Sequence, residues 1–265
     1  MRIFRTRSLL IFAMLALVIL PMLQSQQVIA QDLKSQADQF IDVLEKNDEF
    51  TGIAFLAKGD EILYQRTGGM AVYEWDIPIG TDTRFCLASV SKQFTAAAIL
   101  ILEQDEKLKV EDSISNFFPD FPNGEQITIH QLLTHTSGIP NFTDFKEWMT
   151  ENKVPLEVDS LVADLATREP DFKPGTAFKY SNSGYAMLGR IIELASGQSY
   201  DAFLKARIFE PLKMKDSGTF SGNPTVQNLA FGYAGGSKGY QPAELIDLSQ
   251  GFGAGHIYST VEDMY

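Results

Sequence analysis

A serine and a lysine stand three residues apart at the head of a long apolar run. The segment is Ser89-Val90-Ser91-Lys92, and Gln93 to Leu102 follow it. Residues i and i+3 share one face of a helix, so the hydroxyl of Ser89 and the amine of Lys92 can touch. Because the run is apolar on nearly all sides, it predicts a buried helix. Ser89 is then expected near the helix N-terminus, where free backbone N–H groups and the helix dipole stabilise an oxyanion.

A catalytic role for this pair requires an uncharged lysine. Lys92 accepts the Ser89 proton at neutral pH only if its pKa falls by roughly three units from a reference of about 10.4. Burial and the positive end of a helix both push the pKa in that direction. The alternative is that Ser89 caps the helix while Lys92 lies at the surface, and this short motif alone does not decide between the two.

A second segment adds a phenol and an amide. Tyr180-Ser181-Asn182 stands in a loop that enters a predicted helix. An extended or turning backbone directs side chains two residues apart to the same side, so Tyr180 and Asn182 are candidates for one site. The alternative is a turn-forming cluster over residues 181–184 with a packed tyrosine.

Several ordered segments together resemble one family. Besides the two above, they are Leu132 to Pro140, Pro174-Gly175 and Tyr258 to Asp263. From about Thr51 to its last residue the chain resembles the class C β-lactamases and their relatives among the penicillin-binding serine hydrolases, D-Ala-D-Ala carboxypeptidases, D-aminopeptidases and esterases. The resemblance implies an α+β fold of the β-lactamase/transpeptidase type and a β-lactam, D-Ala-type peptide or ester as substrate.

The resemblance also implies a role for each candidate residue. Ser89 is the acylated nucleophile, Lys92 is its proton partner, Tyr180 is a general acid/base, and Asn182 binds the amide carbonyl of the substrate. An acyl-serine intermediate splits acyl transfer into two easier steps, and a second titratable group hands a proton to the leaving group. A phenol with a reference pKa of about 10 serves as a base only if the Lys92 charge lowers that pKa.

Members of this family carry one more element, a Lys-Thr-Gly or a His- or Gly-containing equivalent, on a strand near the C-terminal end of the domain. No such element follows Tyr258 to Asp263, and Lys238-Gly239 lacks the middle residue. We therefore expect an incomplete domain whose C-terminal helix and final strands are missing, and the activity of the chain in this form stays open.

Residues 1–30 predict export. Three arginines among the first seven residues precede the apolar stretch Leu9 to Leu20, and Val28-Ile29-Ala30 ends with a small residue. This pattern is typical of a secretory signal peptide, here cleaved after about Ala30, and it predicts a periplasmic or secreted protein. An uncleaved anchor is the alternative, although this apolar stretch is short for a membrane span.

The net charge and the cysteine content limit the kinds of partner and bond that we expect. Residues 1–30 hold three arginines and no acidic residue, so their removal changes the net charge from -12 to about -15. Nucleic acids and anionic membrane surfaces are therefore not expected to bind, which leaves a small-molecule or peptide substrate. Cys86 is the only cysteine, so no intramolecular disulfide is expected, and we predict that it is a small buried side chain.

Other chemistries have little support. His130, His135 and His256 lack the spacing of a zinc site, and there is neither a G-x-S-x-G elbow nor a glycine-rich phosphate loop that opens a helix. We therefore expect no metal and no cofactor. His135 is expected to brace a loop through a hydrogen bond, whereas His256 stands among glycines and is either packed or facing the site.

The order of elements predicts one α+β domain over residues 31–265, an antiparallel sheet flanked by helices, with an inserted helical subdomain at about residues 112–169 that several prolines interrupt. The expected helices and strands follow from periodicity and turn residues. The helices are Leu33 to Leu44, Ser183 to Ala195 and Tyr200 to Ile208, and the extended stretches are Thr51 to Lys58, Glu61 to Arg66 and Met70 to Ile79, with a hairpin turn at Gly59-Asp60.

These observations predict an exported serine hydrolase that attacks an amide, β-lactam or ester carbonyl through Ser89. β-Lactamases, D,D-peptidases and esterases share the motifs above, so all three activities remain open. The alternative from another class is a non-catalytic domain of the same fold that binds or senses cell-wall peptide.

Overall fold

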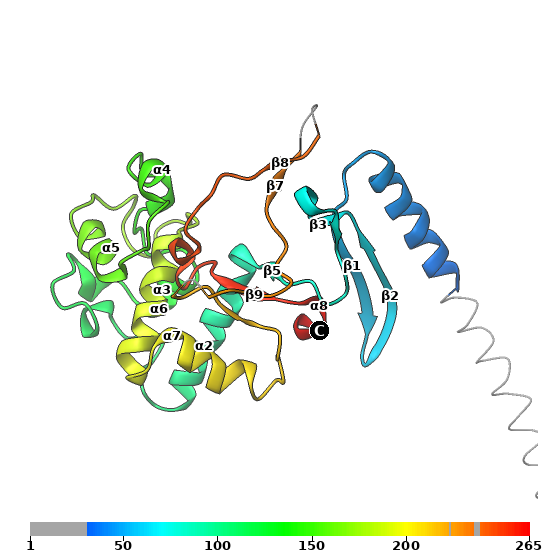
Figure 1. The fold of residues 1–265 in the computed structure, drawn as a ribbon. Coiled ribbons are helices and arrows are strands. Elements are labelled where there is room, and N and C mark those ends of the chain that lie inside the picture. Colours follow the sequence, from blue (N-terminus) through cyan, green and yellow to red (C-terminus); the bar gives the residue numbers. More distant parts are fainter. Residues whose placement is uncertain (1–30, 223, 236–238) are drawn as a thin grey trace, which may run out of the picture. The chain divides into compact units, whose positions relative to one another are not determined.

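The computed structural model describes residues 31–222, 224–235 and 239–265, and the predicted signal peptide over residues 1–30 lies outside them. The chain forms two compact units, one ending at Thr81 and the other beginning at Asp82 (Figure 1). Within the described ranges, no helix has both the length and the apolar character that a membrane span requires.

The N-terminal unit is a helix over residues 31–46 followed by a β-hairpin. Strands β1 (Gly52–Lys58) and β2 (Glu61–Gly68) pair antiparallel, and the turn between them has Gly59 at φ 56°, which confirms the predicted hairpin. One arginine of β2 links the hairpin to the helix. Arg66 forms ion pairs with Asp38, Asp42 and Glu45.

The extended stretch predicted from Met70 to Ile79 is wrong in its middle. Strands β3 (Met70–Val72) and β4 (Ile77–Pro78) pair antiparallel, but a 3₁₀ turn, η1 (Tyr73–Trp75), separates them. Asp76 adopts φ 52°, a left-handed backbone that aspartate tolerates better than most residues and that reverses the chain at this point.

Helices form the core of the C-terminal unit. The two longest, α2 (Lys92–Gln104) and α6 (Asn182–Ser196), contact each other along their apolar faces (Figure 1). Both helices were predicted. In α2, Ile99 and Leu102 are fully buried, but Leu100 is 52% exposed, so the burial expected on nearly all sides of this helix is too extensive.

Local signals set the ends of the later helices. Ser181 caps α6 by accepting a hydrogen bond from the backbone of Gly184, and Gly197 ends it at φ 72°. The helix predicted from Tyr200 to Ile208 exists but changes its hydrogen-bond pattern. It is an α-helix over α7 (Tyr200–Leu204) and a π-helical turn over η6 (Lys205–Phe209).

Residues 112–169 are helix-rich, as expected, but their helices are short. They are η3 (Ile114–Asn116), η4 (Gly124–Gln126), α3 (Ile129–Leu133), η5 (Phe142–Asp144), α4 (Trp148–Glu151) and α5 (Val158–Leu165). A capping box between Thr128 and Gln131 starts α3. The bounds of an inserted subdomain stay a prediction.

The strands of the C-terminal unit are short and antiparallel. A three-stranded sheet has the order β5-β9-β6, which joins segments far apart in the sequence, and β7 pairs with β8. The bounds are β5 (Phe85–Cys86), β6 (Gly218–Thr219), β7 (Tyr233–Ala234), β8 (Gln241–Pro242) and β9 (Ile257–Ser259), with η7 (Leu248–Gly251) before β9 and α8 (Val261–Met264) after it. The fold is therefore α+β, as predicted, with its strands in small antiparallel sheets.

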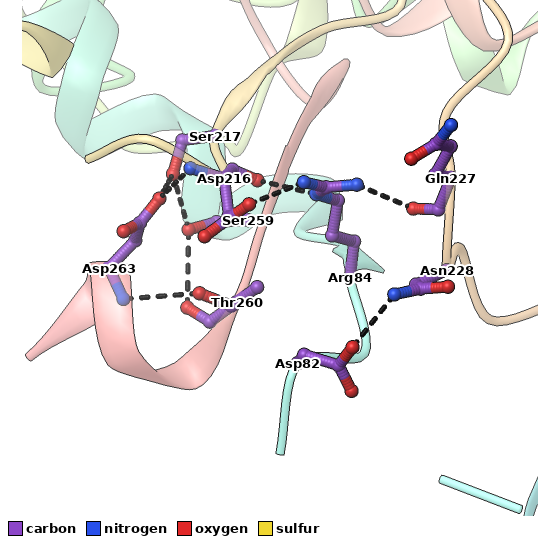
Figure 2. Close-up of polar contacts among 9 residues, drawn as sticks. All are labelled: Asp82, Arg84, Asp216, Ser217, Gln227, Asn228, Ser259, Thr260 and Asp263. Atoms are coloured by element: carbon purple, nitrogen blue, oxygen red, sulfur yellow. Dashed lines mark hydrogen bonds and ion pairs between the residues drawn. The ribbon is translucent and has the colours of Figure 1, made fainter. Parts of the chain in front are cut away.

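A polar network holds the ends of β5, β6 and β9 together (Figure 2). Arg84, just before β5, forms an ion pair with Asp216 and donates a hydrogen bond to the carbonyl of Gln227 at 2.7 Å. The carboxylate of Asp263 on α8 accepts hydrogen bonds from the backbone of Asp216 and the hydroxyl of Ser217, both at 2.7 Å. These contacts fix the sheet from which the chain enters the Ser89 segment.

Replacing Asp263 with alanine should lower the free energy of unfolding by about 1–2 kcal/mol. The reason is that the backbone N–H of Asp216 and the hydroxyl of Ser217, directly before β6, lose their acceptor. Urea unfolding followed by circular dichroism measures the change. Glu262→Ala is the matched control and should leave the urea midpoint unchanged. The carboxylate of Glu262 is exposed and accepts a hydrogen bond from neither of these donors. Equal midpoints for the two variants would contradict the role given to Asp263.

Candidate active site

The predicted nucleophile lies between the small sheet and helix α2. Strand β5 ends at Cys86, and Ser89 follows in a 3₁₀ turn, η2 (Ala88–Ser91), directly before Lys92. Ala88 adopts φ 44°, a left-handed backbone that is rare for alanine and that points to a functional constraint. The turn leaves Ser89 exposed, so an incoming carbonyl carbon can reach its hydroxyl.

Lys92 points inward from the first turn of α2 and is only 7% exposed. Its Nζ lies 3.2 Å from Ser89 Oγ, 2.8 Å from Asn182 Oδ1 and 2.9 Å from the carbonyl of Ala254. An ammonium has three donors, and these three oxygens match them. The alternative of a surface lysine is therefore wrong, and the i, i+3 contact predicted between Ser89 and Lys92 is present.

The environment lowers the pKa of Lys92. Burial is the main cause, because a buried ammonium loses its hydration, and the interaction with Tyr180 opposes the shift more weakly. The direction is the one that a lysine base requires. A lowered pKa increases the fraction of Lys92 that is uncharged and able to accept the Ser89 proton.

Tyr180 comes from the segment before α6, which is remote in the sequence from Ser89. Its hydroxyl lies 2.6 Å from Ser89 Oγ, and its ring lies 4.8 Å from Lys92 Nζ. The tyrosine is 41% exposed, so it is not merely packed in the core. The structure thus brings Ser89, Lys92 and Tyr180 together.

Asn182 is the first residue of α6 and faces the same group. Its Oδ1 accepts a hydrogen bond from Lys92, and its Nδ2 donates to the hydroxyl of Thr143 at 3.2 Å. The neighbouring Asn141 accepts from the Asn182 backbone at 2.9 Å and donates to Thr143 at 2.7 Å. Asn182 is therefore held from both ends, with its amide beside Lys92.

Sequence reasoning missed Asn141 and Thr143. They follow directly after the Leu132 to Pro140 segment, so the signal available was their position after a motif already noted. Nothing in their spacing predicts that they contact Asn182, because the two segments are separated by about forty residues and meet only through the fold.

His135 braces the Tyr180 loop, as predicted. Its Nδ1 accepts a hydrogen bond from the backbone of Ser181 at 3.2 Å, and its carbonyl accepts from Lys179 at 3.0 Å. Its ring lies 4.6 Å from the Tyr180 ring. Burial first, and the Lys92 charge second, lower the pKa of His135 and keep the imidazole neutral. His135 positions Tyr180 without touching Ser89 Oγ.

Two other predictions have different outcomes. The prediction that Cys86 is buried is wrong, because the residue is exposed and borders the same cavity as Ser89. Its Sγ lies 3.8 Å from the carbonyl of Gly255, and the protein atoms packed around the sulfur raise the pKa of the thiol, which keeps it protonated. Of the two options left open for His256, packing holds, since this residue is 1% exposed behind the site.

A cavity of about 400 Å³ opens beside Ser89. Its walls come from η5, α4 and the segment around η7, and they are mainly apolar. The lining side chains of these walls are Phe142, Thr143, Trp148, Ile246, Asp247, Leu248 and Gln250. The Trp148 indole donates a hydrogen bond to Gln250, whose amide in turn donates to the carbonyl of Val154, so the aromatic wall is fixed. Among the lining residues, Asp247 is the single charged side chain.

The described residues contain no group of three or more His, Cys, Asp or Glu side chains placed to hold a metal ion. The groups that contact one another around Ser89 are its hydroxyl, the Lys92 amine, the Tyr180 phenol and the Asn182 amide. This set suits acyl transfer, in which a nucleophile and two proton carriers surround one carbonyl carbon.

Known proteins share this arrangement of segments. A protein-family model described as Beta-lactamase matches residues 37–265. The putative penicillin-binding protein PbpX of Bacillus subtilis (strain 168) is 36% identical over 217 residues, which are 82% of this chain and 53% of the relative. Esterase EstB of Burkholderia gladioli is 30% identical over 252 residues, 85% of this chain and 62% of the relative.

A solved structure is similar as well. The D-amino acid amidase of Ochrobactrum anthropi SV3, crystallised with L-phenylalanine amide, superposes with a TM-score of 0.73 at 29% identity. The match covers 83% of this chain and 65% of the amidase. The chain thus spans about half to two thirds of the length of these proteins.

Proposed function

Because the chain belongs to the β-lactamase family, whose model matches residues 37–265, we propose that it is a serine hydrolase that cleaves an amide, β-lactam or ester bond through an acyl-Ser89 intermediate. Its α+β fold is of the predicted β-lactamase/transpeptidase type, as its likeness to a penicillin-binding protein from Bacillus halodurans shows, at a TM-score of 0.72.

One observation carries the proposal. Ser89 Oγ lies within hydrogen-bond distance of both Tyr180 OH, at 2.6 Å, and Lys92 Nζ, at 3.2 Å. In the first step, Ser89 Oγ attacks the carbonyl carbon while Lys92 takes its proton. Tyr180 then passes a proton to the leaving group as the bond to that group breaks. In the second step, water attacks the acyl-serine and gives its proton to the Tyr180 oxygen, and Lys92 returns the proton that it took to Ser89 Oγ as the bond between this oxygen and the acyl group breaks.

The cavity walls support an apolar acyl group. Trp148 provides flat aromatic surface, and the ring of Phe142, which is 3% exposed, packs against it at 6.4 Å and nearly at right angles. Asp247 is the single charge on these walls, so an anionic acyl group is disfavoured there, while a neutral or ammonium-bearing one is accepted. Relatives that include an esterase and a D-amino acid amidase fit this description without deciding between an ester and an amide.

Replacing Trp148 with alanine should raise KM for an ester with a bulky aromatic acyl group about tenfold and leave KM for the acetyl ester nearly unchanged. The reason is that only the bulky aromatic acyl group reaches Trp148. Loss of the apolar contact with one aromatic side chain weakens binding by about tenfold. Steady-state kinetics with the two esters measure it. Trp75→Ala, which changes a tryptophan that is 77% exposed in the N-terminal unit, is the matched control. An equal rise for both esters would contradict the assignment.

Export is also part of the proposal, with a periplasmic or secreted product. It rests on the basic residues, the apolar stretch and the small residue that end at Ala30. Expression of the complete coding sequence, followed by N-terminal sequencing of the mature protein from the periplasm or medium, tests it. A mature N-terminus near Gln31 is expected, and an intact Met1 in the cytoplasm would contradict export.

The test of the enzymatic function is a panel of carbonyl compounds offered to the folded protein. A chromogenic ester, a D-alanyl amide and a fluorescent penicillin are each followed for turnover and for covalent label on the protein. Turnover or label with at least one of them is expected. Saturable binding of a D-Ala-terminated peptide with no acylation by any compound would support the non-catalytic alternative instead.

A further inference from the structure

His256 is a buried titratable side chain that the proposed reaction does not use. It is 1% exposed, and its ring packs against the rings of Tyr200, at 5.2 Å, and Phe252, at 5.5 Å, which themselves lie 5.3 Å apart. It does not line the cavity beside Ser89. A buried imidazole in a cluster of three aromatic rings needs a reason to be there, because burying its polar ring has a free-energy cost.

The polar contacts of His256 are with Ser221 and with Asp201 of α7. The Nε2 atom lies 3.4 Å from Ser221 Oγ and 3.8 Å from the carboxylate of Asp201. Ser221 donates its own hydrogen to Asp201 at 2.9 Å, so the hydrogen between Ser221 and His256 must come from Nε2. These contacts place a hydrogen on Nε2, and Nδ1 has no hydrogen-bond partner among the described residues.

Asp201 is the charged end of this chain of contacts. Burial alone would raise its carboxyl pKa, but hydrogen bonds from His256, Thr219 and Ser221 hold the pKa below its ordinary value. The carboxylate keeps access to solvent, since it is 38% exposed and borders a separate cavity of about 530 Å³. Asp201 therefore stays ionised and gives His256 a fixed acceptor.

The backbone just before His256 is part of the candidate active site. Residues 251–255 form a turn whose Ala254 carbonyl accepts from Lys92 Nζ at 2.9 Å. The Gly253 carbonyl accepts from Thr95, one turn further along α2, at 2.6 Å, and the same hydroxyl lies 2.6 Å from Tyr200 OH. Residues 251–255 therefore connect Tyr200, whose ring packs on His256, with Lys92, which faces Ser89.

Residues 251–255 pack closely against α6. Gly253 adopts φ 66°, and a Cβ there would collide with the carbonyl of Tyr185 on α6. Gly189 of α6 packs so closely that its own Cβ would lie 2.8 Å from the Phe252 ring. Because close-packed interiors transmit displacement, a change in how His256 is held must move the Ala254 carbonyl.

We propose that His256, held by Asp201 and Ser221, is a positioning residue that aims the Ala254 carbonyl at Lys92 and so sets the protonation of the proposed base. The proposal rests on the proposed function of Lys92. It assigns His256 no contact with substrate, and it explains why a polar ring occupies a buried aromatic cluster.

The direction of the effect follows from the groups around each residue. Lys92 faces Ser89, Asn182, the Ala254 carbonyl and the titratable groups of Tyr180, Tyr185 and His135. A hydrogen bond to a carbonyl stabilises the ammonium more than the neutral amine. If the Ala254 carbonyl turns away, the pKa of Lys92 falls further, and the neutral amine also loses one of the contacts that orient its lone pair.

The experiment compares acylation by a fluorescent penicillin or a chromogenic ester across pH in the full chain. His256→Phe keeps an aromatic ring in the cluster with Tyr200 and Phe252 but removes the Nε2 donor. It should lower the plateau acylation rate about tenfold and move the acidic limb of the pH profile down by about one unit. His256→Gln places a donor near the former Nε2 position and should restore most of both quantities.

Leu165→Ala controls for a loss of stability alone. This residue is 1% exposed in α5 and makes none of the contacts above, so its variant should lower the melting temperature and leave the pH profile in place. A wild-type pH profile and rate in His256→Phe would overturn the proposal, and so would a lowered rate with an unmoved acidic limb. A wild-type protein that reacts with none of the compounds would instead contradict the proposed function.

Discussion

Replacing Lys92 with methionine should reduce the acylation rate by about a thousandfold, which is the range for the loss of a positioned general base. Methionine is unbranched, so it fits the buried space that the Lys92 side chain, 7% exposed, fills. Its thioether cannot accept a proton from Ser89. Stopped-flow acylation by a fluorescent penicillin or burst kinetics with a chromogenic ester measure the rate. Lys107→Met, at an exposed lysine just after α2, is the matched control and should react like the wild type.

The pH profile gives the same prediction an independent readout. Lys92 acts as a base only when neutral, so the acylation rate should rise with pH and level off above the pKa of this lysine in the folded protein. Because burial lowers that pKa, the rise should lie below the range, about pH 10, in which an ordinary lysine loses its proton. In Lys92→Met the residual rate should lose this rise. A profile that keeps the same limb in the variant would show that another group titrates.

Replacing Ser89 with alanine should abolish both turnover and covalent labelling, because Ser89 carries the hydroxyl that both proposed proton carriers contact. Its hydroxyl is the one that lies 2.6 Å from Tyr180 and 3.2 Å from Lys92. The competing nucleophile is the exposed thiol of Cys86, which borders the same cavity but keeps its proton. Cys86→Ser is therefore the matched control, and it should retain the wild-type turnover.

The core of the candidate site could be predicted because its signals are local. The i, i+3 spacing of Ser89 and Lys92 sets their contact within one helical turn, and the apolar run behind them predicts burial of the lysine. Tyr180 could be included only through the resemblance to a family, since no local rule brings a residue some ninety positions away to within hydrogen-bond distance of Ser89. The hairpin at Gly59-Asp60 followed from turn chemistry in the same local way.

The features that sequence reasoning missed depend on tertiary contacts. Asn141 and Thr143 support Asn182 from another segment, and the Ala254 carbonyl reaches Lys92 through a backbone turn that no side-chain pattern encodes. The exposure of Cys86 was missed for a related reason. Its apolar neighbours in the sequence suggested burial, whereas strand β5 ends at this residue and turns its side chain toward the cavity.

The most direct test is to identify the residue that becomes acylated. The wild-type protein, Ser89→Ala and Cys86→Ser are treated with the same β-lactam or activated ester, digested and mapped by mass spectrometry. The mass of one acyl group on the peptide that contains Ser89, present in the wild type and Cys86→Ser and absent from Ser89→Ala, is the predicted result. An acyl group that maps to Cys86, or that persists in Ser89→Ala, would contradict it.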